Sequence, residues 1–201
     1  MLIKVCGMRE QQNAADVAAL GVDMMGFIFF ERSARFVDGV TPSTPKGIKR
    51  VGVFVNAPID YILSAVSQHL LNFVQLHGSE SVELCRELKA RSIGVIKAIS
   101  IATKDDIALT TQYNNEVDYF VFDTKCTGYG GSGERFDWSI LEAYQGSTPF
   151  LLSGGIDPSS VDEIKTIHHK AFAGVDLNSR FEVAPALKNS EKLRDFIEKI
   201  R

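Results

Sequence analysis

Cys6 and Asp123 are the residues whose side chains are best suited to proton transfer, and each ends a short apolar run. Lys4 would share the face of Cys6 if the first run is a strand, because side chains alternate along a strand. A nearby ammonium group favours the thiolate, the form of cysteine that acts as a base or a nucleophile. A small buried residue fits the position as well, since free cysteines are commonly buried and inert.

Asp123 follows the apolar run from Tyr119 to Phe122. A carboxyl group between apolar walls tends to keep its proton, because burial penalises the charged form. It would then be able to act as a general acid. The alternative is a carboxylate that caps the next loop or pairs with Lys125, since structural ion pairs are also common at such positions.

Glycine and polar residues follow two later apolar runs. Gly154 and Gly155 precede an expected helix start at Pro158, and Asn178-Ser179-Arg180 follow the last run. Backbone N–H groups before a helix bind phosphate, and α/β barrels often place a phosphate site after their seventh and eighth strands. The alternative is a pair of tight turns without a ligand.

Arg35 is the candidate for a second anion site, because a guanidinium group can hold a carboxylate at two points. The alternative is a solvated loop arginine. His77 ends the fourth run and is expected to be a hydrogen-bonded residue near the ligand. Asp176 lies in the run expected to neighbour the first strand, and it is the predicted partner of Lys4; Lys97 is expected to point into the same barrel interior.

The segment from Gly128 to Gly133 matches the pattern G-x-G-x-x-G. It follows the sixth run, whereas the dinucleotide-binding fingerprint belongs to the first strand–helix turn of its fold. We interpret it as a loop that closes over ligand. A plain surface loop is the alternative.

Eight apolar runs alternate with amphipathic segments along the chain, the order typical of parallel strands joined by helices. The predicted strands are Leu2–Cys6, Met24–Phe29, Arg50–Val55, Phe73–His77, Val95–Ile99, Tyr119–Asp123, Phe150–Ser153 and Ala173–Leu177. The predicted helices are Gln11–Leu20, Ile59–Leu70, Ser79–Lys89, Asp157–Ile167 and Ser190–Ile200. The predicted fold class is α/β, a (β/α)8 TIM barrel of the phosphate-binding type, in which the active site lies at the C-terminal ends of the strands. The alternative is an open doubly wound sheet, which eight units would make unusually wide.

The second unit of this barrel is expected to be reduced. The stretch from Val37 to Arg50 contains Pro42, Pro45 and Gly47, which disfavour a helix. The whole chain of 201 residues is near the lower limit for a fold that typically takes about 250 residues. We expect residues 1–201 to form a single domain.

Charge, apolar runs and cysteine spacing limit the kinds of partner and location expected for this chain. The net charge is −3 and the basic residues are scattered, which argues against nucleic acid binding. No run approaches the roughly 18 apolar residues of a membrane span. The spacing of the three cysteines, Cys6, Cys85 and Cys126, is not that of zinc ligands. No signal-peptide pattern is found at the start of the sequence. We expect a cytoplasmic protein without a metal or other cofactor.

Ordered motifs along the chain resemble phosphoribosylanthranilate isomerase, an enzyme family of tryptophan biosynthesis. The matching segments are Lys4–Met8, Gly26–Phe29, Ser33–Phe36, Val51–Asn56, Val74–Glu80, Phe122–Lys125, Gly130–Gly133, Phe136–Trp138, Leu152–Ile156 and Val175–Asp176. The resemblance runs from Ile3 to about Glu182. Any one segment is modest evidence, but the ordered set is specific.

The resemblance implies an Amadori rearrangement of N-(5-phosphoribosyl)anthranilate without a cofactor. Asp123 would protonate the ribose ring oxygen, and Cys6 would remove the proton from C2. Arg35 would hold the anthranilate carboxylate, while Gly155 and Ser179 with neighbouring backbone would hold the phosphate. The expected assembly is a monomer or a homodimer.

The chain departs from the family pattern at two places. Ser179-Arg180-Phe181-Glu182 stands where the family has Ser-Gly, an apolar residue and Glu, so Arg180 is expected either to compensate by its charge or to point away. Pro185-Ala186-Leu187-Lys188-Asn189 stands where the family has Pro-Gly-x-Lys-Asp.

Two other functions fit the fold. One is another aldose–ketose isomerase of this barrel type, acting on a histidine-pathway aminoaldose or a pentose phosphate. The other is a non-catalytic phospho-ligand binder. The presence of both Cys6 and Asp123 counts against each of them.

Overall fold

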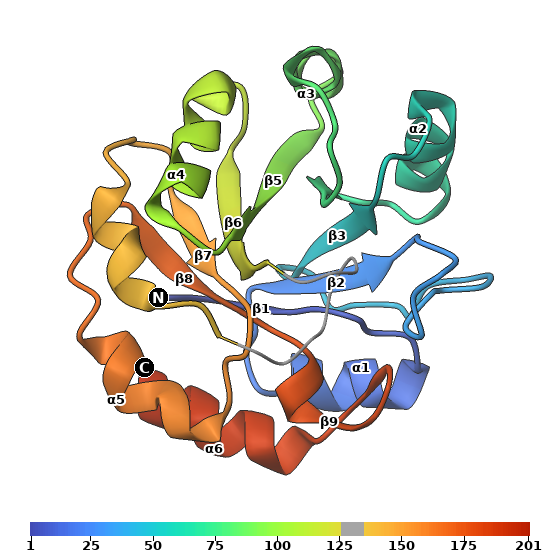
Figure 1. The fold of residues 1–201 in the computed structure, drawn as a ribbon. Helices are drawn as coiled ribbons and strands as arrows, with labels where there is room; N and C mark the ends of the chain where they lie inside the picture. The colour runs from blue at the N-terminus through green and yellow to red at the C-terminus, as the bar shows by residue number, and fades with distance from the viewer. Residues whose placement is uncertain (126–134) are drawn as a thin grey trace.

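Eight parallel strands close into a barrel with helices around its outside (Figure 1). The computed structural model describes residues 1–125 and 135–201. Strands β1 to β8 are neighbours in chain order, and β8 pairs with β1 so that Asp176 lies opposite Lys4. The predicted fold class is confirmed.

The predicted strands all form, with ends within about two residues of the expected ones. The strands are β1 (Leu2–Val5), β2 (Met24–Ile28), β3 (Lys49–Phe54), β4 (Phe73–Leu76), β5 (Gly94–Ile101), β6 (Tyr119–Thr124), β7 (Phe150–Leu152) and β8 (Phe172–Leu177), followed by β9 (Glu182–Ala184) and β10 (Leu187–Lys188). The α-helices are α1 (Gln11–Ala18), α2 (Ile59–Gln68), α3 (Val82–Ala90), α4 (Lys104–Ile107), α5 (Val161–Lys165) and α6 (Ser190–Ile200). The 3₁₀ helices are η1 (Ala108–Tyr113), η2 (Trp138–Ala143), η3 (Pro158–Ser160) and η4 (Ser179–Phe181).

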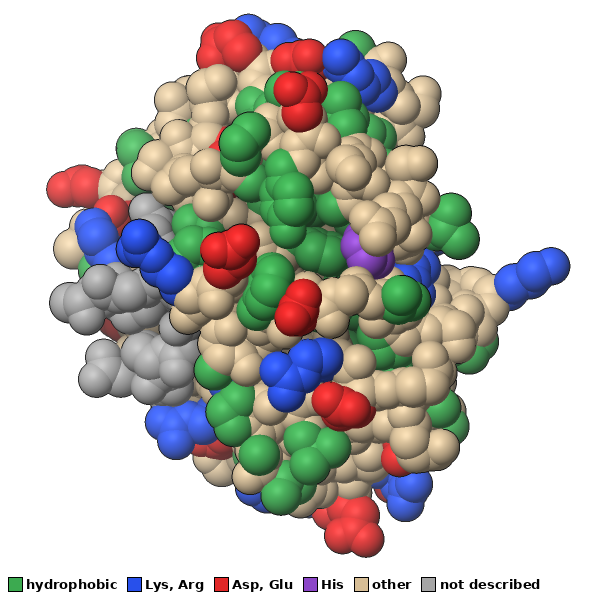
Figure 2. Space-filling model, turned by 90° about the vertical axis from the view of Figure 1, so that its right-hand side faces the viewer, with side chains coloured by type: hydrophobic (Ala, Val, Ile, Leu, Met, Phe, Trp, Pro, Cys, Tyr) green, Lys and Arg blue, Asp and Glu red, His purple; other side chains and the backbone are tan. Residues whose placement is uncertain are grey.

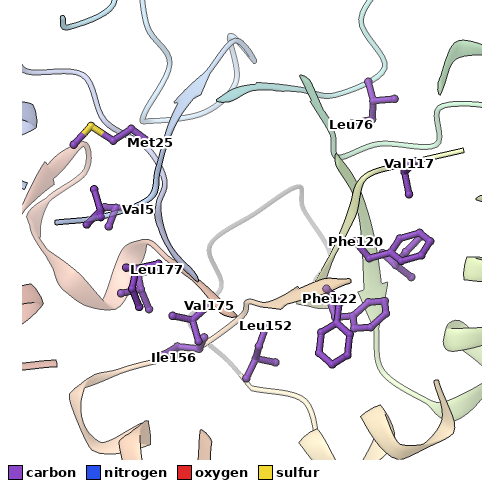
Figure 3. Close-up of a cluster of buried hydrophobic side chains, with 14 of the residues drawn as sticks. Val5, Met25, Leu76, Val117, Phe120, Phe122, Leu152, Ile156, Val175 and Leu177 are labelled. Carbon is purple, nitrogen blue, oxygen red and sulfur yellow. The ribbon is translucent and has the colours of Figure 1, made fainter. Parts of the chain in front are cut away.

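Alternation along the strands sorts the apolar side chains into two layers. The larger cluster lies between the barrel and its helices, and Figure 3 shows members such as Val5, Phe122 and Leu177 pointing away from the barrel interior. A smaller cluster fills the interior. Its buried members are Met24, Val51, Ile96, Ala98, Val121 and Leu151. The interior is therefore packed below the strand ends.

The connection between β2 and β3 has no helix, as the prolines predicted. Arg50 at the start of β3 fixes this segment instead. Its guanidinium group donates to the carbonyl oxygens of Pro42 (2.7 Å) and His69 (2.8 Å) and to the hydroxyl of Thr41, and it lies over the ring of Phe27. One side chain thus attaches the irregular segment to the end of α2 and to the barrel.

Helix α3 begins later than the sequence suggested. Ser81, rather than Ser79, caps it, because the Ser81 hydroxyl accepts a hydrogen bond from Leu84 N. Glu80 is therefore outside the helix, where it is buried and forms an ion pair with Lys97 at 3.0 Å. Lys97 lies on the opposite face of β5 from Ile96 and Ala98, so the expectation that it points into the barrel interior is wrong.

The chain after β8 covers one side of the barrel. Strands β9 and β10 form an antiparallel hairpin, and α6 then packs against α1 and α5. On the face in Figure 2, acidic and basic side chains are interspersed, with hydrophobic side chains between them. Among the described residues, no helix is both long and apolar enough to cross a membrane.

Candidate active site

A cavity of about 280 Å³ opens among the C-terminal ends of the barrel strands. The predicted site residues that line it are Cys6, Arg35, His77, Asp123, Gly154, Gly155, Asp176, Asn178 and Ser179. Arg180 is exposed and is not among the residues that line the cavity. Residues from six of the eight β/α units therefore meet at one place, as expected for the active-site end of this fold.

Cys6 is almost completely buried, at 5% exposure, and Gly26 on the neighbouring strand β2 makes room for it. A Cβ atom at Gly26 would lie 2.7 Å from the Cys6 sulfur atom, closer than packed atoms allow. Burial raises the pKa of the Cys6 thiol, and the ammonium group of Lys4 only partly opposes this shift. Lys4 does favour the thiolate as expected, but burial outweighs it, and the Asp176 carboxylate, paired with Lys4 at 2.7 Å, raises the pKa of the thiol further.

The Lys4–Asp176 pair confirms the predicted partnership of β1 and β8. Burial disfavours the Lys4 ammonium, but Asp176 outweighs burial and raises the pKa of Lys4. Only one carboxylate oxygen of Asp176 is engaged by Lys4. The other, Oδ1, is buried without a hydrogen-bond partner among the described residues, although Asp176 lines the cavity. A ligand hydroxyl group would satisfy it.

Asp123 lies in a more polar setting than its apolar strand suggested. One of its carboxylate oxygens accepts a hydrogen bond from Thr124 N at 2.9 Å, and the other is 3.3 Å from Nε2 of His77. Nδ1 of His77 is in turn 3.3 Å from Nε2 of Gln75. These contacts hold the carboxyl group toward the cavity, and they place a histidine where a proton can be exchanged with it.

The loop after β7 has the form expected of an anion site. Gly154 and Gly155 both have positive φ angles, of 80° and 64°. For neither N–H group does the structure record an acceptor among residues 1–125 and 135–201. The helical segment that follows is short: η3 and α5 together run only from Pro158 to Lys165. The open N–H groups rather than a long helix therefore favour phosphate here.

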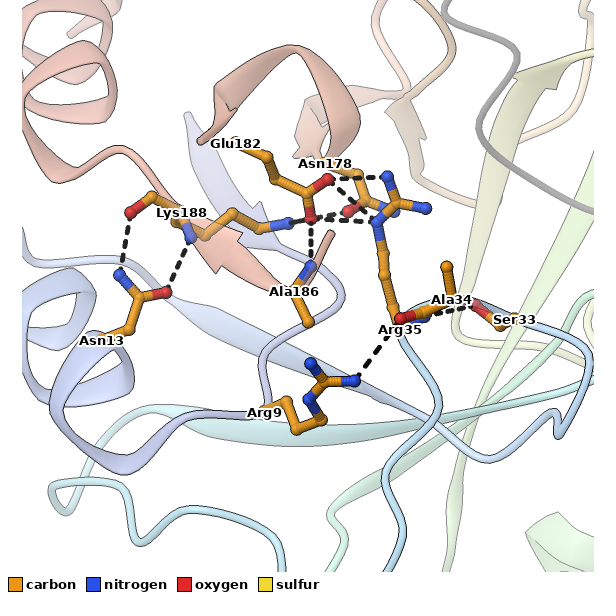
Figure 4. Close-up of polar contacts among 9 residues, drawn as sticks. All are labelled: Arg9, Asn13, Ser33, Ala34, Arg35, Asn178, Glu182, Ala186 and Lys188. Atoms are coloured by element: carbon orange, nitrogen blue, oxygen red, sulfur yellow. Dashed lines mark hydrogen bonds and ion pairs between the residues drawn. The ribbon is translucent and has the colours of Figure 1, made fainter. Parts of the chain in front are cut away.

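Arg35 is held by the hairpin that follows the barrel. Its Nε and Nη2 atoms donate to the two carboxylate oxygens of Glu182, at 2.9 and 2.6 Å (Figure 4). Glu182 also accepts from Nζ of Lys188 at 2.5 Å, and Lys188 donates to the side chain of Asn178 at 2.8 Å. Burial alone would raise the pKa of Glu182, but hydrogen bonds to Arg35 and Lys188 outweigh burial and lower it. Glu182 is therefore a carboxylate.

Sequence reasoning did not find several residues of this site. Gln75 and Thr124 also line the cavity. The alternation of β4 was a usable signal for Gln75, since it shares the inward face with His77. The family pattern contains Glu182 and Lys188, but no local pattern could have paired Glu182 with Arg35, because that contact joins segments 147 residues apart. The segment Gly128 to Gly133, interpreted above as a closing loop, lies outside the described residues.

The arrangement suits a proton transfer on a doubly anionic ligand. Cys6 and Asp123 line one cavity, as a thiol that can serve as a base and a carboxyl that can serve as an acid. Arg35 and the Gly154-Gly155 loop supply two separate sites for negative charge. An acid, a base and two anion sites together fit the isomerisation of a phosphorylated substrate that carries a second anionic group.

Comparisons with known proteins agree with this chemistry. A model of the family described as N-(5'phosphoribosyl)anthranilate (PRA) isomerase matches residues 3–199. The N-(5'-phosphoribosyl)anthranilate isomerases of Parabacteroides distasonis and Phocaeicola vulgatus are 53% and 49% identical to the chain. The matches cover all of this chain and 93% and 98% of those relatives.

A solved structure is also similar. The phosphoribosyl anthranilate isomerase of Thermotoga maritima superposes with a TM-score of 0.85 at 33% identity, covering 100% of this chain and 98% of that one. Another structure, of an enzyme in complex with reduced 1-(o-carboxyphenylamino)-1-deoxyribulose 5-phosphate, has a TM-score of 0.82 at 30% identity, with coverage of 100% and 98%.

Proposed function

The chain belongs to the N-(5'-phosphoribosyl)anthranilate isomerase family, and on that premise we propose that Cys6 and Asp123 carry out the two proton transfers of its reaction. The enzyme converts N-(5-phosphoribosyl)anthranilate into 1-(2-carboxyphenylamino)-1-deoxyribulose 5-phosphate in tryptophan biosynthesis by an Amadori rearrangement. The observation that supports the assignment is that both residues line one cavity together with both candidate anion sites.

Asp123 is the general acid of this proposal. It donates its proton to the ribose ring oxygen, the bond from that oxygen to C1 breaks, and the nitrogen lone pair forms a C1=N double bond. His77, 3.3 Å away, orients the carboxyl group and can return the proton it loses. The proton-donating form of Asp123 is the state that the mechanism requires at this step.

Cys6 is the general base. Its thiolate removes the proton from C2 of the open-chain iminium ion. The C2–H electron pair becomes a C1=C2 bond, and the C1=N pair returns to nitrogen, which gives the neutral enolamine. Proton transfer from the C2 hydroxyl to C1 then yields the ketone. Gly26 leaves the space that the sulfur atom occupies at the cavity.

The remaining site residues bind the substrate. Gly154, Gly155 and Ser179 hold the phosphate through backbone N–H groups, and Arg35 holds the anthranilate carboxylate. The unpartnered Oδ1 of Asp176 accepts a hydrogen bond from a sugar hydroxyl. Asn178 takes part mainly through its contact with Lys188, and Arg180 contributes charge from outside the cavity.

The test is the loss of anthranilate-type fluorescence when the purified protein meets freshly generated phosphoribosylanthranilate. We expect rapid loss with the wild-type enzyme and turnover lower by about 10²–10⁴-fold in each of Cys6→Ala and Asp123→Asn, the usual contribution of a general acid or base. Cys85→Ala is the matched control, since Cys85 is a buried thiol of α3 outside the cavity. Near-normal turnover in either site variant would exclude its assigned role.

Three further properties follow from the family and complete the proposal. We expect one domain over residues 1–201, a cytoplasmic location, and a monomer or homodimer that binds a small phosphosugar and no nucleic acid. A related Thermotoga maritima enzyme is described as dimeric, and a structure of monomers made from it has a TM-score of 0.80 at 30% identity. Sedimentation of the purified chain would distinguish the two assembly states.

A further inference from the structure

The side chain of Arg35 is fixed by a network that reaches well beyond the barrel mouth. A guanidinium group has five N–H donors, and Glu182 occupies the edge formed by Nε and one hydrogen of Nη2. For Nη1 the structure gives no acceptor among the described residues. The end formed by Nη1 and Nη2 thus remains available, and it presents two parallel donors to a ligand carboxylate.

Glu182 itself is held at three points. Lys188 Nζ and the N–H group of Ala186 both donate to its Oε1 atom, at 2.5 and 3.1 Å, while Arg35 engages both oxygens (Figure 4). The side chains of Glu182 and Lys188 are only 5% and 0% exposed. An arginine bound to a carboxylate that is itself this constrained has little freedom to rotate.

The backbone around the network is shaped to hold it. Ala186 has a φ of 66°, a conformation that costs a non-glycine residue of the order of 1–3 kcal/mol and that directs its N–H group at Glu182. Gly7, with a φ of 74°, leaves space on the other side. A Cβ atom at Gly7 would lie 2.7 Å from Cδ of Arg35 and 2.9 Å from Oδ1 of Asn178. The strained backbone at Ala186 thus supplies a hydrogen bond to Glu182, and the missing side chain at Gly7 leaves space for Arg35 and Asn178.

We propose that Glu182 is a positioning residue, held in place by Lys188, that fixes Arg35 so that the Nη1–Nη2 end meets the anthranilate carboxylate of the substrate. The inference rests on the proposed function, because it assumes that Arg35 binds this carboxylate. It assigns to the β9–β10 hairpin, which lies outside the barrel, part of the selectivity for an aromatic acid. Glu182 does not touch the substrate and acts only through Arg35.

Glu182 could instead compete with the ligand carboxylate for the positive charge of Arg35. A carboxylate beside Arg35 also lowers the positive charge that attracts the ligand, so removing it would strengthen binding if long-range attraction dominated. We expect positioning to dominate, because the Glu182 edge and the ligand edge of the guanidinium group are different, and a freely rotating arginine loses its two-point contact. The sign of the change in affinity separates the two effects.

The test uses two ligands that differ only in the carboxylate, measured by calorimetry. One is reduced 1-(o-carboxyphenylamino)-1-deoxyribulose 5-phosphate, and the other is the same compound without the carboxyl group. In Glu182→Gln we expect the affinity for the first ligand to fall at least about tenfold, and that for the second to change less than about twofold. In steady-state kinetics KM should rise by a similar factor with kcat nearly unchanged, because a uniform binding contribution is lost.

Two further variants complete the design. Glu182→Asp keeps the negative charge but has a side chain shorter by one methylene group. The positioning role therefore predicts that this variant, too, loses affinity for the carboxylated ligand and not for the other. Glu87→Gln removes the same charge from the exposed face of α3 and should bind both ligands as the wild type does. Unchanged binding of the ligand without the carboxyl group shows that the variant is folded with an intact phosphate site.

The outcomes that contradict the inference differ from those that contradict the proposed function. Wild-type affinity of Glu182→Gln for the carboxylated ligand, or a tighter complex, overturns the positioning role. A wild-type enzyme that does not prefer the carboxylated ligand overturns the role of Arg35 and with it the premise. An equal loss for both ligands would show that Glu182 supports the whole site rather than Arg35.

Discussion

Burial controls the chemical state of the two described cysteines. Burial raises the pKa of Cys85 to about 11, so its thiol stays protonated under ordinary conditions. Burial also raises the pKa of Cys6, but Lys4 opposes the shift and the side chain lines the cavity. One residue is therefore an inert core thiol, and the other is a base whose active form grows with pH.

Alkylation of Cys6 should become faster as the pH rises. The thiolate is the reactive form, and a raised pKa places its formation above the ordinary cysteine value of about 8.5. We expect labelling by iodoacetamide, followed by mass spectrometry in a Cys126→Ser background, to increase throughout the range from about pH 7 to 9, with kcat/KM rising in parallel. Cys85 serves as the internal control and should remain unlabelled. A Cys6 labelling rate that is constant over this range would show that the thiolate is already fully formed.

At the scale of elements, sequence patterns predicted the barrel because its strands are regular. Each strand is a short apolar run, and closure places Lys4 opposite Asp176 as expected. Local signals failed where a tertiary contact decides. The helix predicted from Ser79 begins only after Ser81, and Glu80, which would lie in its first turn, instead forms a buried ion pair with Lys97.

The candidate site was predictable to the same extent and for the same reason. Residues that end strands were found, since the fold places strand ends together. The ion pair of Glu182 with Arg35 was not predicted, because it depends on how the chain after β8 returns to the β2 loop. The balance at Cys6 was left open for a related reason, since the sequence displays the charge of Lys4, which lowers the pKa of the thiol, but not the depth of burial, which raises it.

Arg50 should carry much of the stability of the segment that replaces the second helix. Arg50→Met would leave the carbonyl oxygens of Pro42 and His69 without this donor, and an unsatisfied buried polar group costs about 1–3 kcal/mol. We expect the urea midpoint to fall accordingly at unchanged m-value, with Arg50→Lys intermediate because lysine keeps the charge and some of the hydrogen bonds. Equal stability of Arg50→Met and the wild type would mean that water replaces the guanidinium group without loss.

At the scale of the whole molecule, the buried Lys4–Asp176 ion pair joins the two strands that close the barrel, and Asp176 also lines the cavity. Lys4 on β1 and Asp176 on β8 are 0% and 5% exposed, and their strands are the pair that closes the barrel. A buried pair is weak evidence for stability, because two desolvated charges can usually be replaced by apolar residues without loss. The location of Asp176 at the cavity and of Lys4 beside Cys6 offers a functional reason for the pair.

Replacing one partner and then both should separate closure from function. Lys4→Met leaves Asp176 buried without its counter-charge, and we expect a loss of about 3–5 kcal/mol in the free energy of unfolding. The double variant Lys4→Met/Asp176→Leu should recover most of this stability. Its kcat/KM should stay far below that of the wild type, because Cys6 loses its ammonium neighbour and the substrate loses the Asp176 oxygen.

Urea unfolding followed by Trp138 fluorescence and by far-UV circular dichroism measures the free energy of unfolding, and a single coincident transition is expected of one domain. Wild-type turnover in the double variant would show that the pair serves only to close the barrel, and a double variant as unstable as Lys4→Met would show that the charges themselves are needed for closure.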